Sequence, residues 1–375
     1  MTYLGKDIPK LGFGLMRLPE VKTDGKKAID IEQVKEMVDI FMAAGFTYFD
    51  TAFLYHGGRS EAVAKTVLVD RYPRESFQLA TKLPAWMATD AESAKAMFFT
   101  SLERTGAGYF DYYLLHNLGD MRTAVFEEYN LWNFALEQKA QGKIKHLGFS
   151  WHDKAEPLEA VLKAHPEAEF VQLQINYVDW ESPSIESMKC YEVARKYGKP
   201  VIVMEPLRGG LLAEVPSSVS SILQAVDPAA SLPSWALRFA ASLEGLITVL
   251  SGMSEVQHVR ENVAIMNNFA PLTENEQAAL EQARKAIEGL PHVPCTNCDY
   301  CRKSCSENIN IPAILGSLNI YLRYSNLKRA RGDYFFSSMK AKASQCIECG
   351  NCEEVCPQHI AIPQELKRCA ELFEV

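Results

Sequence analysis

The sequence lacks the features that mark membrane-spanning, exported and nucleic-acid-binding proteins. No segment offers the roughly 20 consecutive apolar residues that a bilayer span needs, and the first residues show no apolar core of a secretory signal. There is no long basic run, and the formal net charge of −8 disfavours nonspecific binding to nucleic acid or to anionic membranes. We therefore expect a cytoplasmic protein that binds neither a membrane nor nucleic acid.

Cysteine is almost absent from the first 294 residues, where Cys190 stands alone, yet nine of the ten cysteines follow that point. In a chain without an export signal, clustered cysteines more often bind metal than form disulfides. We interpret Cys190 as a small buried hydrophobic residue. The length of 375 residues suits one large domain and one small domain.

Strand-like and helix-like segments alternate through the N-terminal part of the chain. We expect eight strands, at Leu11–Arg17, Thr47–Asp50, Phe77–Thr81, Tyr112–His116, His146–Ser150, Val171–Ile175, Val201–Met204 and Leu246–Leu250. Helical patterns between them, such as Arg122–Gln141, are typical of a (β/α)8 barrel. A doubly wound open sheet is the alternative, but the strand count and the lack of an early Gly-x-Gly-x-x-Gly turn favour the barrel. We expect the stretch before the first strand to form a short hairpin that closes the barrel floor.

A break in the helical pattern marks the domain boundary. The segment Gly289–Pro294 reads Gly-Leu-Pro-His-Val-Pro, which ends the preceding helix, and the cysteine-rich part begins after it. We therefore predict a barrel domain over residues 1–288 and a cysteine-rich domain over residues 289–375.

Two copies of the spacing C-x2-C-x2-C-x3-C lie 51 residues apart, and each is followed by Ile-x-Ile-Pro. Soft thiolates suit iron–sulfur clusters, and this is the spacing of bacterial ferredoxins. Three closely spaced cysteines wrap one 4Fe–4S cubane, whereas the fourth projects towards the other cluster. We therefore predict two clusters, one held by Cys295, Cys298, Cys301 and Cys356, and the other by Cys346, Cys349, Cys352 and Cys305.

A pair of zinc sites, each with four cysteine ligands, is the alternative, although zinc sites usually use two separated C-x2-C pairs. The region resembles two-cluster ferredoxin domains, with one departure: Ser306 replaces the proline expected after Cys305. The long segment before Cys346 contains a helical pattern over Ile314–Leu327. This pattern favours the helical type of ferredoxin domain.

Four residues of complementary chemistry lie at successive predicted strand ends: Asp50, Tyr55, Lys82 and His116. Active sites of barrels lie at the C-terminal ends of the strands, so we expect the four to converge. Tyr55 can donate a proton to the alkoxide that hydride attack on a carbonyl leaves, and a lysine cation lowers its pKa of about 10. Asp50 would fix Lys82, and His116 would stabilise the developing charge. Each residue alone is more often an ordinary loop residue, but together they predict carbonyl reduction.

These residues carry a resemblance to a known family. Phe49–Tyr55, Thr81-Lys82 and Leu114–His116 resemble the aldo/keto reductase signature, over roughly residues 1–285. The resemblance implies a barrel that binds NAD(P)H without a Rossmann domain, with Asp50, Tyr55, Lys82 and His116 as the catalytic tetrad. It also implies cofactor contacts at Met16, Ser150, Gln174, Met204, Pro206, Leu207, Arg208, Glu261 and Asn262.

The cofactor side departs from the family at several positions. Trp151 stands where the family has an asparagine, and Gly252 and His258 stand where a lysine and an arginine commonly hold the 2′-phosphate. Arg260 could substitute for these cations, so NADH and NADPH both stay open, as does an altered cofactor such as a flavin. The aromatic residues near strand ends either line a substrate pocket or pack the barrel top: Phe53, Trp86, Trp151 and Trp180.

Three functions compete at this point. The first is an NAD(P)H-dependent reductase of a small-molecule carbonyl, with structural or redox-sensing clusters. The second is an electron-transfer oxidoreductase whose clusters exchange electrons with a ferredoxin-like partner. That second function would normally need a flavin to join one-electron and hydride chemistry, and the sequence shows no flavin motif. The third is a non-enzymatic scaffold, which the intact tetrad disfavours.

Overall fold

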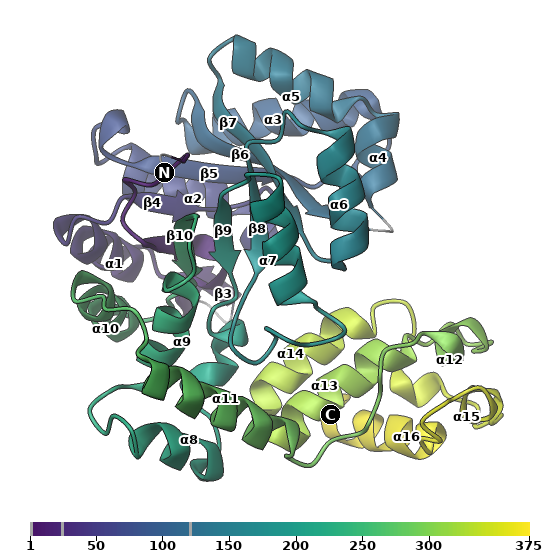
Figure 1. Cartoon of the computed structure of the whole chain (residues 1–375). Helices are drawn as coiled ribbons and strands as arrows, with labels where there is room; N and C mark the ends of the chain where they lie inside the picture. The colour runs from purple at the N-terminus through teal and green to yellow at the C-terminus, as the bar shows by residue number, and fades with distance from the viewer. Residues whose placement is uncertain (1–2, 24–25, 120–121) are drawn as a thin grey trace. The chain divides into compact units, whose positions relative to one another are not determined.

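Eight parallel strands close into a barrel in the order β1-β10-β9-β8-β7-β6-β5-β4 (Figure 1). The structure is a computed structural model that describes residues 3–23, 26–119 and 122–375. The barrel strands are β1 (Leu11–Gly14), β4 (Tyr48–Asp50), β5 (Gln78–Leu83), β6 (Phe110–Leu118), β7 (Ile144–Trp151), β8 (Phe170–Gln174), β9 (Val201–Met204) and β10 (Leu246–Ser251). The predicted barrel is confirmed, and the open sheet is wrong.

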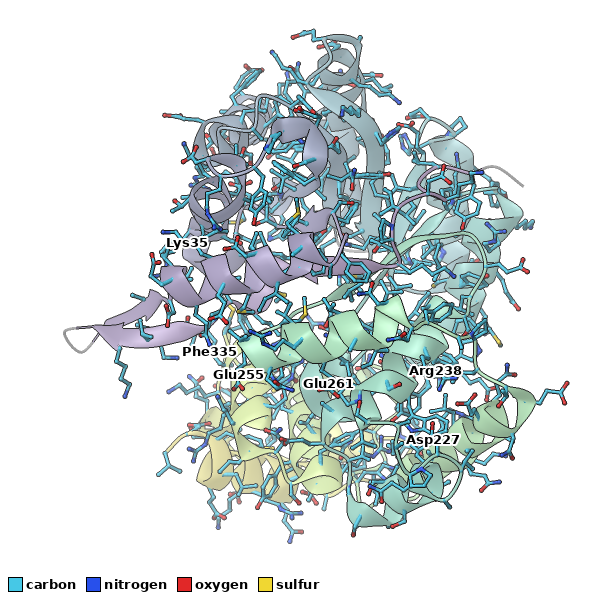
Figure 2. The ribbon with its side chains drawn as sticks, turned by 90° about the vertical axis from the view of Figure 1, so that its left-hand side faces the viewer. Lys35, Asp227, Arg238, Glu255, Glu261 and Phe335 are labelled. Atoms are coloured by element: carbon cyan, nitrogen blue, oxygen red, sulfur yellow. The ribbon has the colours of Figure 1, made fainter. Side chains whose placement is uncertain are left out.

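Helices surround the barrel, and their apolar faces explain why. In α1 (Ile31–Ala43), Asp30 caps the first turn by accepting from the backbone of Gln33 at 3.1 Å, and the buried residues recur at helical spacing. The other helices between or after the strands are α2 (Ser60–Ala64), α3 (Ala91–Thr105), α4 (Thr123–Glu128), α5 (Leu131–Ala140), α6 (Ala155–Ala164), α7 (Ser187–Lys196), α9 (Leu232–Ala241) and α10 (Val256–Asn267). α1 packs beside α10, the helix that carries Glu261 (Figure 2).

The barrel floor differs from its prediction. Residues 3–10 form turns rather than a hairpin, with a bond from the Ile8 amide to the Gly5 carbonyl oxygen at 3.0 Å. Gly5 has a φ of 76°, and its turn lies so close to Ile247 that an added Cβ would approach within 2.7 Å. This turn folds the segment back against the barrel interior, so the predicted hairpin is wrong. A hairpin does form after the first strand, from β2 (Glu20–Thr23) and β3 (Lys26–Ile29).

The predicted helix over Arg122–Gln141 is two helices, α4 and α5. The break lies at Asn130, whose φ of 51° is left-handed. Asparagine tolerates this conformation better than most residues, so the break costs little. Helical periodicity on both sides of Asn130 hides the break in the sequence.

The chain forms two compact units. One comprises Met1–Leu212 and Pro233–Asn275, and the other comprises Ala213–Leu232 and Glu276–Val375. The second is helical: α8 (Ser217–Gln224), α11 (Glu274–Glu288), α12 (Tyr300–Lys303), α13 (Ile311–Tyr324), α14 (Leu327–Ser337), α15 (Asn351–Glu354) and α16 (Ile362–Phe373). The predicted helical character is confirmed, whereas the boundary between residues 288 and 289 stays a prediction.

An internal repeat organises the second unit. α12 and α15 begin 51 residues apart, and so do α13 and α16. The backbone repeats as well, because residues with left-handed φ pair at the same shift, Asn297 (57°) with Glu348 (55°) and Asp299 (67°) with Gly350 (81°). α14 lies between the two copies and accounts for the long segment seen in the sequence.

No helix in the described part of the chain combines the length and the apolar composition that a bilayer crossing requires. The cytoplasmic location stays a prediction.

Candidate active site and cluster sites

Lys82, near the end of β5, lies at the centre of the predicted tetrad. Its ammonium nitrogen donates to the Asp50 carboxylate, to the Thr51 carbonyl oxygen at 2.8 Å and to the Tyr55 hydroxyl oxygen at 3.3 Å. Lys82 is 1% exposed and Asp50 is 3% exposed. The three ammonium protons thus have three acceptors. Because the Tyr55 oxygen accepts from Lys82, its own O–H is directed to another partner.

The loop after β4 brings Tyr55 to this position. Tyr55 begins a short turn whose next three residues have left-handed φ: His56 (52°), Gly57 (66°) and Gly58 (86°). The two glycines adopt this conformation at low cost. His56 is held in place by its ring, because Nε2 accepts from the Leu18 amide at 3.1 Å. The sequence Tyr-His-Gly-Gly therefore folds the chain back and sets Tyr55 beside Lys82.

The charge states follow from burial and pairing. Burial raises the pKa of Tyr55 above that of a free phenol, and the Lys82 cation opposes the rise only in part. Burial also raises the pKa of Asp50, against the lowering effect of Lys82. Burial alone would lower the pKa of Lys82, but the charges of Asp50 and Tyr55 raise it overall. At neutral pH, Lys82 is therefore an ammonium and Tyr55 is protonated. The acidifying effect expected from Lys82 is present but smaller than the effect of burial.

His116, on β6, faces the same site. Its ring lies 6.1 Å from the Tyr55 ring and 5.3 Å from the Trp86 ring, centroid to centroid. Burial and then the positive charge of Lys82 lower its pKa well below the usual range, so the imidazole is neutral. Its Nδ1 atom is buried and has no hydrogen-bond partner among the described residues. This ring nitrogen is available to a ligand.

Of the four aromatic residues considered for a substrate pocket, Trp86 is the one that contacts His116. The Arg104 guanidinium lies 4.3 Å from the Phe53 ring. Trp151 donates to the Asp153 carbonyl oxygen at 2.8 Å, and Trp180 packs with Tyr191. These contacts make Trp86 the pocket candidate.

Gln172 is a site residue that the sequence prediction missed. It lies on β8, is buried, and donates from Nε2 to the second carboxylate oxygen of Asp50 at 3.2 Å. Gln172 and Gln174 are two residues apart on one strand, so both side chains lie on the same face. That pair of amides inside an otherwise apolar strand is the signal that could have found it.

Two of the predicted cofactor contacts, Ser150 and Gln174, lie at the ends of β7 and β8, and Asn117, which the sequence prediction missed, lies beside Ser150 at the end of β6. Ser150, on β7, accepts from the Asn117 amide at 2.7 Å. Asn117 has a φ of 56°, and its side-chain oxygen is buried without a partner among the described residues. Two orphaned atoms, His116 Nδ1 and Asn117 Oδ1, thus lie on consecutive residues of one strand end. Buried polar atoms are normally paired, so these two atoms fit the polar groups of bound ligands.

Gln174 and Arg208 are brought together by Asp179, which the sequence prediction missed. Asp179 accepts from Gln174 Nε2 at 2.9 Å and pairs with the Arg208 guanidinium at 3.2 Å. Arg208 begins a short turn after β9 and has a φ of 49°. The acid is separated from its arginine along the chain, so sequence spacing alone gives no signal for the pair.

The remaining predicted cofactor residues are spread along the barrel top. Met204 ends β9, buried Pro206 and half-buried Leu207 follow it, and Met16 is 50% exposed after β1. Asn262, on α10, donates to the Ser251 hydroxyl at 2.9 Å, which ties it to the end of β10.

The cations considered for a 2′-phosphate are engaged elsewhere or replaced. Arg260 pairs with Glu36 of α1 at 3.3 Å on the exposed surface. Arg17 lies across Gly252, where an added Cβ would meet its side chain at 3.2 Å, and pairs with Glu205 at 3.8 Å. The aliphatic part of the Arg17 side chain therefore lies beside the position where the family commonly has a lysine.

Two hollows in the second unit are lined by the predicted cluster cysteines. The lining of one includes Cys305, Cys346, Cys349 and Cys352. The lining of the other includes Cys295, Cys298, Cys301 and Cys356. Each hollow thus combines three cysteines of one copy with the fourth of the other. The thiols surround a space: in the described part of the chain, no three His, Cys, Asp or Glu side chains converge on a single metal ion. Four soft thiols around each space fit a 4Fe–4S cubane.

Cys190 lies outside both motifs. It is buried, and burial raises the pKa of its thiol to about 12. The interpretation of Cys190 as a small buried residue is confirmed.

Comparison with known families gives the assignment. The aldo/keto reductase family model matches residues 10–285. The chain belongs to the aldo/keto reductase family. A model of the 4Fe-4S dicluster domain matches residues 294–361. This member of the aldo/keto reductase family is thus an NAD(P)-dependent oxidoreductase with an iron–sulfur domain.

Relatives and solved structures agree with the fold. An aldo-keto reductase of Mycobacterium sp. (strain MCS) is 26% identical over 282 residues, which cover 74% of this chain and 87% of the relative. The NADH-specific methylglyoxal reductase of Escherichia coli is 25% identical over 289 residues, covering 65% and 85%. The holo form of an aldo-keto reductase from Bacillus halodurans has a TM-score of 0.60 at 23% identity, covering 75% of this chain and 95% of that one. A Klebsiella pneumoniae aldo-keto reductase in complex with NADPH has a TM-score of 0.58 at 21% identity, covering 73% and 90%.

Proposed function

We propose that the barrel reduces the carbonyl group of a small molecule to an alcohol, with NAD(P)H as the hydride donor and Tyr55 as the proton donor. The observation that carries this proposal is the set of three bonds donated by the buried Lys82 ammonium. They fix the Tyr55 oxygen and leave its proton for a substrate. Tyr55 is half-buried with its hydroxyl beside a buried ammonium, and proton donation to a carbonyl explains this arrangement best.

The residues divide the reaction as follows. The bound cofactor supplies a hydride to the carbonyl carbon. Tyr55 gives its phenolic proton to the carbonyl oxygen, which receives the electron pair of the C=O π bond, and water later returns the proton. Lys82, held by Asp50, stabilises the phenolate that remains, and the neutral His116 ring hydrogen-bonds the same substrate oxygen. Trp86, packed on His116, forms the apolar wall beside the reacting carbonyl.

The cofactor lies along the strand ends in this proposal. Ser150, Asn117 and Gln174 would hold the carboxamide, and Met204 would contact the nicotinamide ring. Arg208 approaches the pyrophosphate. The other contacts are Met16, Pro206 and Leu207, with Glu261 and Asn262 at the adenine. Because Arg17 lies beside Gly252, it is the candidate cation for a 2′-phosphate, and the choice between NADH and NADPH depends on it.

The C-terminal domain, proposed to span residues 289–375, holds two 4Fe–4S clusters in the two cysteine-lined hollows. Cys298 and Cys349 are both exposed, so the outer edge of each hollow is open to a partner. This exposure favours a second candidate function, in which a ferredoxin-like protein exchanges single electrons with the clusters. A flavin spectrum in the purified protein would favour that function over direct hydride transfer from NAD(P)H.

The test is an anaerobic preparation in which iron, acid-labile sulfide, flavin and nicotinamide are counted. NAD(P)H oxidation is then followed over a panel of carbonyl compounds for the wild type and for Tyr55→Phe. Tyr72→Phe serves as the matched control, because Tyr72 hydrogen-bonds Asp39 away from the site. Loss of turnover in Tyr55→Phe alone is expected. Equal rates in all three proteins would end the proposed mechanism.

A further inference from the structure

A single buried carboxylate joins the ends of β8 and β9. Asp179 is 2% exposed. Its Oδ2 atom accepts from Gln174 Nε2 at 2.9 Å and from Asn176 Nδ2 at 2.8 Å, while Oδ1 pairs with the Arg208 guanidinium at 3.2 Å. Both oxygens are therefore engaged. Gln174 ends β8, Asn176 follows it, and Arg208 lies in the turn after β9. Gln174 and Arg208 are the residues proposed to hold the nicotinamide and the pyrophosphate.

Asp179 decides which way the Gln174 amide faces. An ionised carboxylate only accepts hydrogen bonds, so the NH2 group of Gln174 must face Asp179. The amide oxygen, Oε1, then faces away, and no donor among the described residues is bonded to it. An oxygen in that place can accept from the NH2 group of a carboxamide. A reversed amide would instead put two oxygens together at Asp179.

Asn176 ties the same carboxylate to the backbone of the β9 turn. Its Oδ1 accepts from the amides of Val178 at 3.1 Å and Asp179 at 2.9 Å, which sets the Asp179 backbone. Its Nδ2 also donates to the Glu205 carbonyl oxygen at 3.2 Å. The Arg208 amide donates to that same carbonyl oxygen at 2.9 Å. Asn176 thus contacts the base of the Arg208 turn, and Asp179, which bonds Asn176, pairs with the Arg208 guanidinium.

We propose that Asp179 is a positioning residue for the dinucleotide: it orients the Gln174 amide towards the carboxamide and holds the Arg208 turn for the pyrophosphate. This inference rests on the proposed cofactor contacts of Gln174 and Arg208. Asp179 itself touches neither the cofactor nor the substrate. Its effect is to couple two contacts at opposite ends of the nicotinamide half of the cofactor.

The experiment measures binding by calorimetry on the anaerobic, cluster-loaded full chain. The probes are NADH, NADPH and ADP-ribose, which lacks the nicotinamide. Gln174→Ala is expected to weaken the binding of NADH and NADPH only, whereas Arg208→Ala is expected to weaken the binding of all three probes. Asp179→Asn keeps the shape of the side chain but removes its charge. It is expected to weaken the binding of NADH and NADPH about tenfold and the binding of ADP-ribose by less. In the Gln174→Ala background, Asp179→Asn should weaken the binding of NADH and NADPH by less, because Asp179 can no longer act through the Gln174 amide and acts only through Arg208.

Asp111→Asn is the matched control. Asp111 is also buried, pairs with Arg74 at 2.6 Å and Lys145 at 2.9 Å, and lies at the start of β6, the other end of the strands. The Asp111→Asn variant should be less stable to unfolding but should bind NADH, NADPH and ADP-ribose as tightly as the wild type. Wild-type binding by Asp179→Asn, or an equal loss in both backgrounds, overturns the role of Asp179 while Gln174→Ala and Arg208→Ala still weaken binding. If those two variants bind normally, the proposed cofactor site fails and the inference fails with it.

Discussion

The barrel and the C-terminal unit build their sites in opposite ways. In the barrel, the protein itself satisfies the charged group: Lys82 has acceptors from Asp50, Thr51 and Tyr55, and the core around the site is apolar. In the C-terminal unit, the thiols of Cys301, Cys352 and Cys356 are themselves part of the core. The difference teaches that the barrel satisfies its buried ammonium with its own side chains and backbone, and leaves His116 Nδ1 and Asn117 Oδ1 to a ligand. The C-terminal unit instead depends on what the cysteines hold.

Breaking the barrel site is expected to have the largest effect. Tyr55→Phe removes the proton donor and should lower kcat about 1000-fold, within the usual range for general acid catalysis. The iron content and the visible spectrum of the clusters should stay unchanged. Steady-state NAD(P)H oxidation and iron analysis on the same sample check both parts. A parallel loss of iron would show that the two regions are not independent.

Removing the iron is expected to unfold the C-terminal unit. Chelation of iron under reducing conditions should open the C-terminal unit, because its core includes the ligand thiols. Hydrogen exchange should then show α13 and α16 losing protection about 100-fold or more, whereas β5 and β6 keep theirs. Equal losses in strands and helices would contradict the comparison.

Arg17→Ala tests which cation of the barrel contacts a 2′-phosphate. If Arg17 is the cation for a 2′-phosphate, the change should weaken NADPH binding about tenfold and leave NADH binding nearly unchanged. Calorimetry with both cofactors measures the difference. Arg260→Ala is the control, because Arg260 pairs with Glu36 on the exposed surface. The same loss for NADH and NADPH would exclude Arg17 as the phosphate contact.

Cys349→Ala tests whether the chain holds the two proposed clusters. Cys349 lines one hollow and not the other, so iron should fall from about eight to about four atoms per chain. Cys190→Ala should leave the iron content unchanged, because Cys190 lies outside both hollows. Iron and sulfide analysis with a cluster spectrum checks the outcome. Loss of all iron would mean that the two clusters assemble only together.

The pH dependence should show the smallest change. The pKa of Tyr55 is raised by burial, so the protonated donor persists above the free phenol value of about 10. The pKa of His116 is lowered well below its usual range, so its ring stays neutral down into acid. We therefore expect a nearly flat kcat/KM from about pH 6.5 to 9. A fall centred within that window would contradict a protonated Tyr55 and a neutral His116.

Some parts of the structure could be predicted because they depend on local spacing. The cysteine spacing predicts which thiols share a hollow, since a short loop can wrap only one cubane. The order of Asp50, Lys82 and His116 at successive strands predicts that they meet, because parallel strands end at one face.

Other parts depend on three-dimensional context that spacing does not carry. Gln172 and Asp179 gain their roles from partners on other strands, and the break at Asn130 is a backbone conformation within an unbroken helical pattern. The balance between burial and the Lys82 charge in the pKa of Tyr55 likewise requires the folded environment.

The central claim is that Lys82 acts on catalysis through Tyr55. The most direct measurement is the rate of carbonyl reduction in Tyr55→Phe, Lys82→Met and the double variant, all with intact clusters. The account predicts that the double variant is no slower than Tyr55→Phe, because both changes remove the same proton transfer. Losses that multiply in the double variant would contradict it.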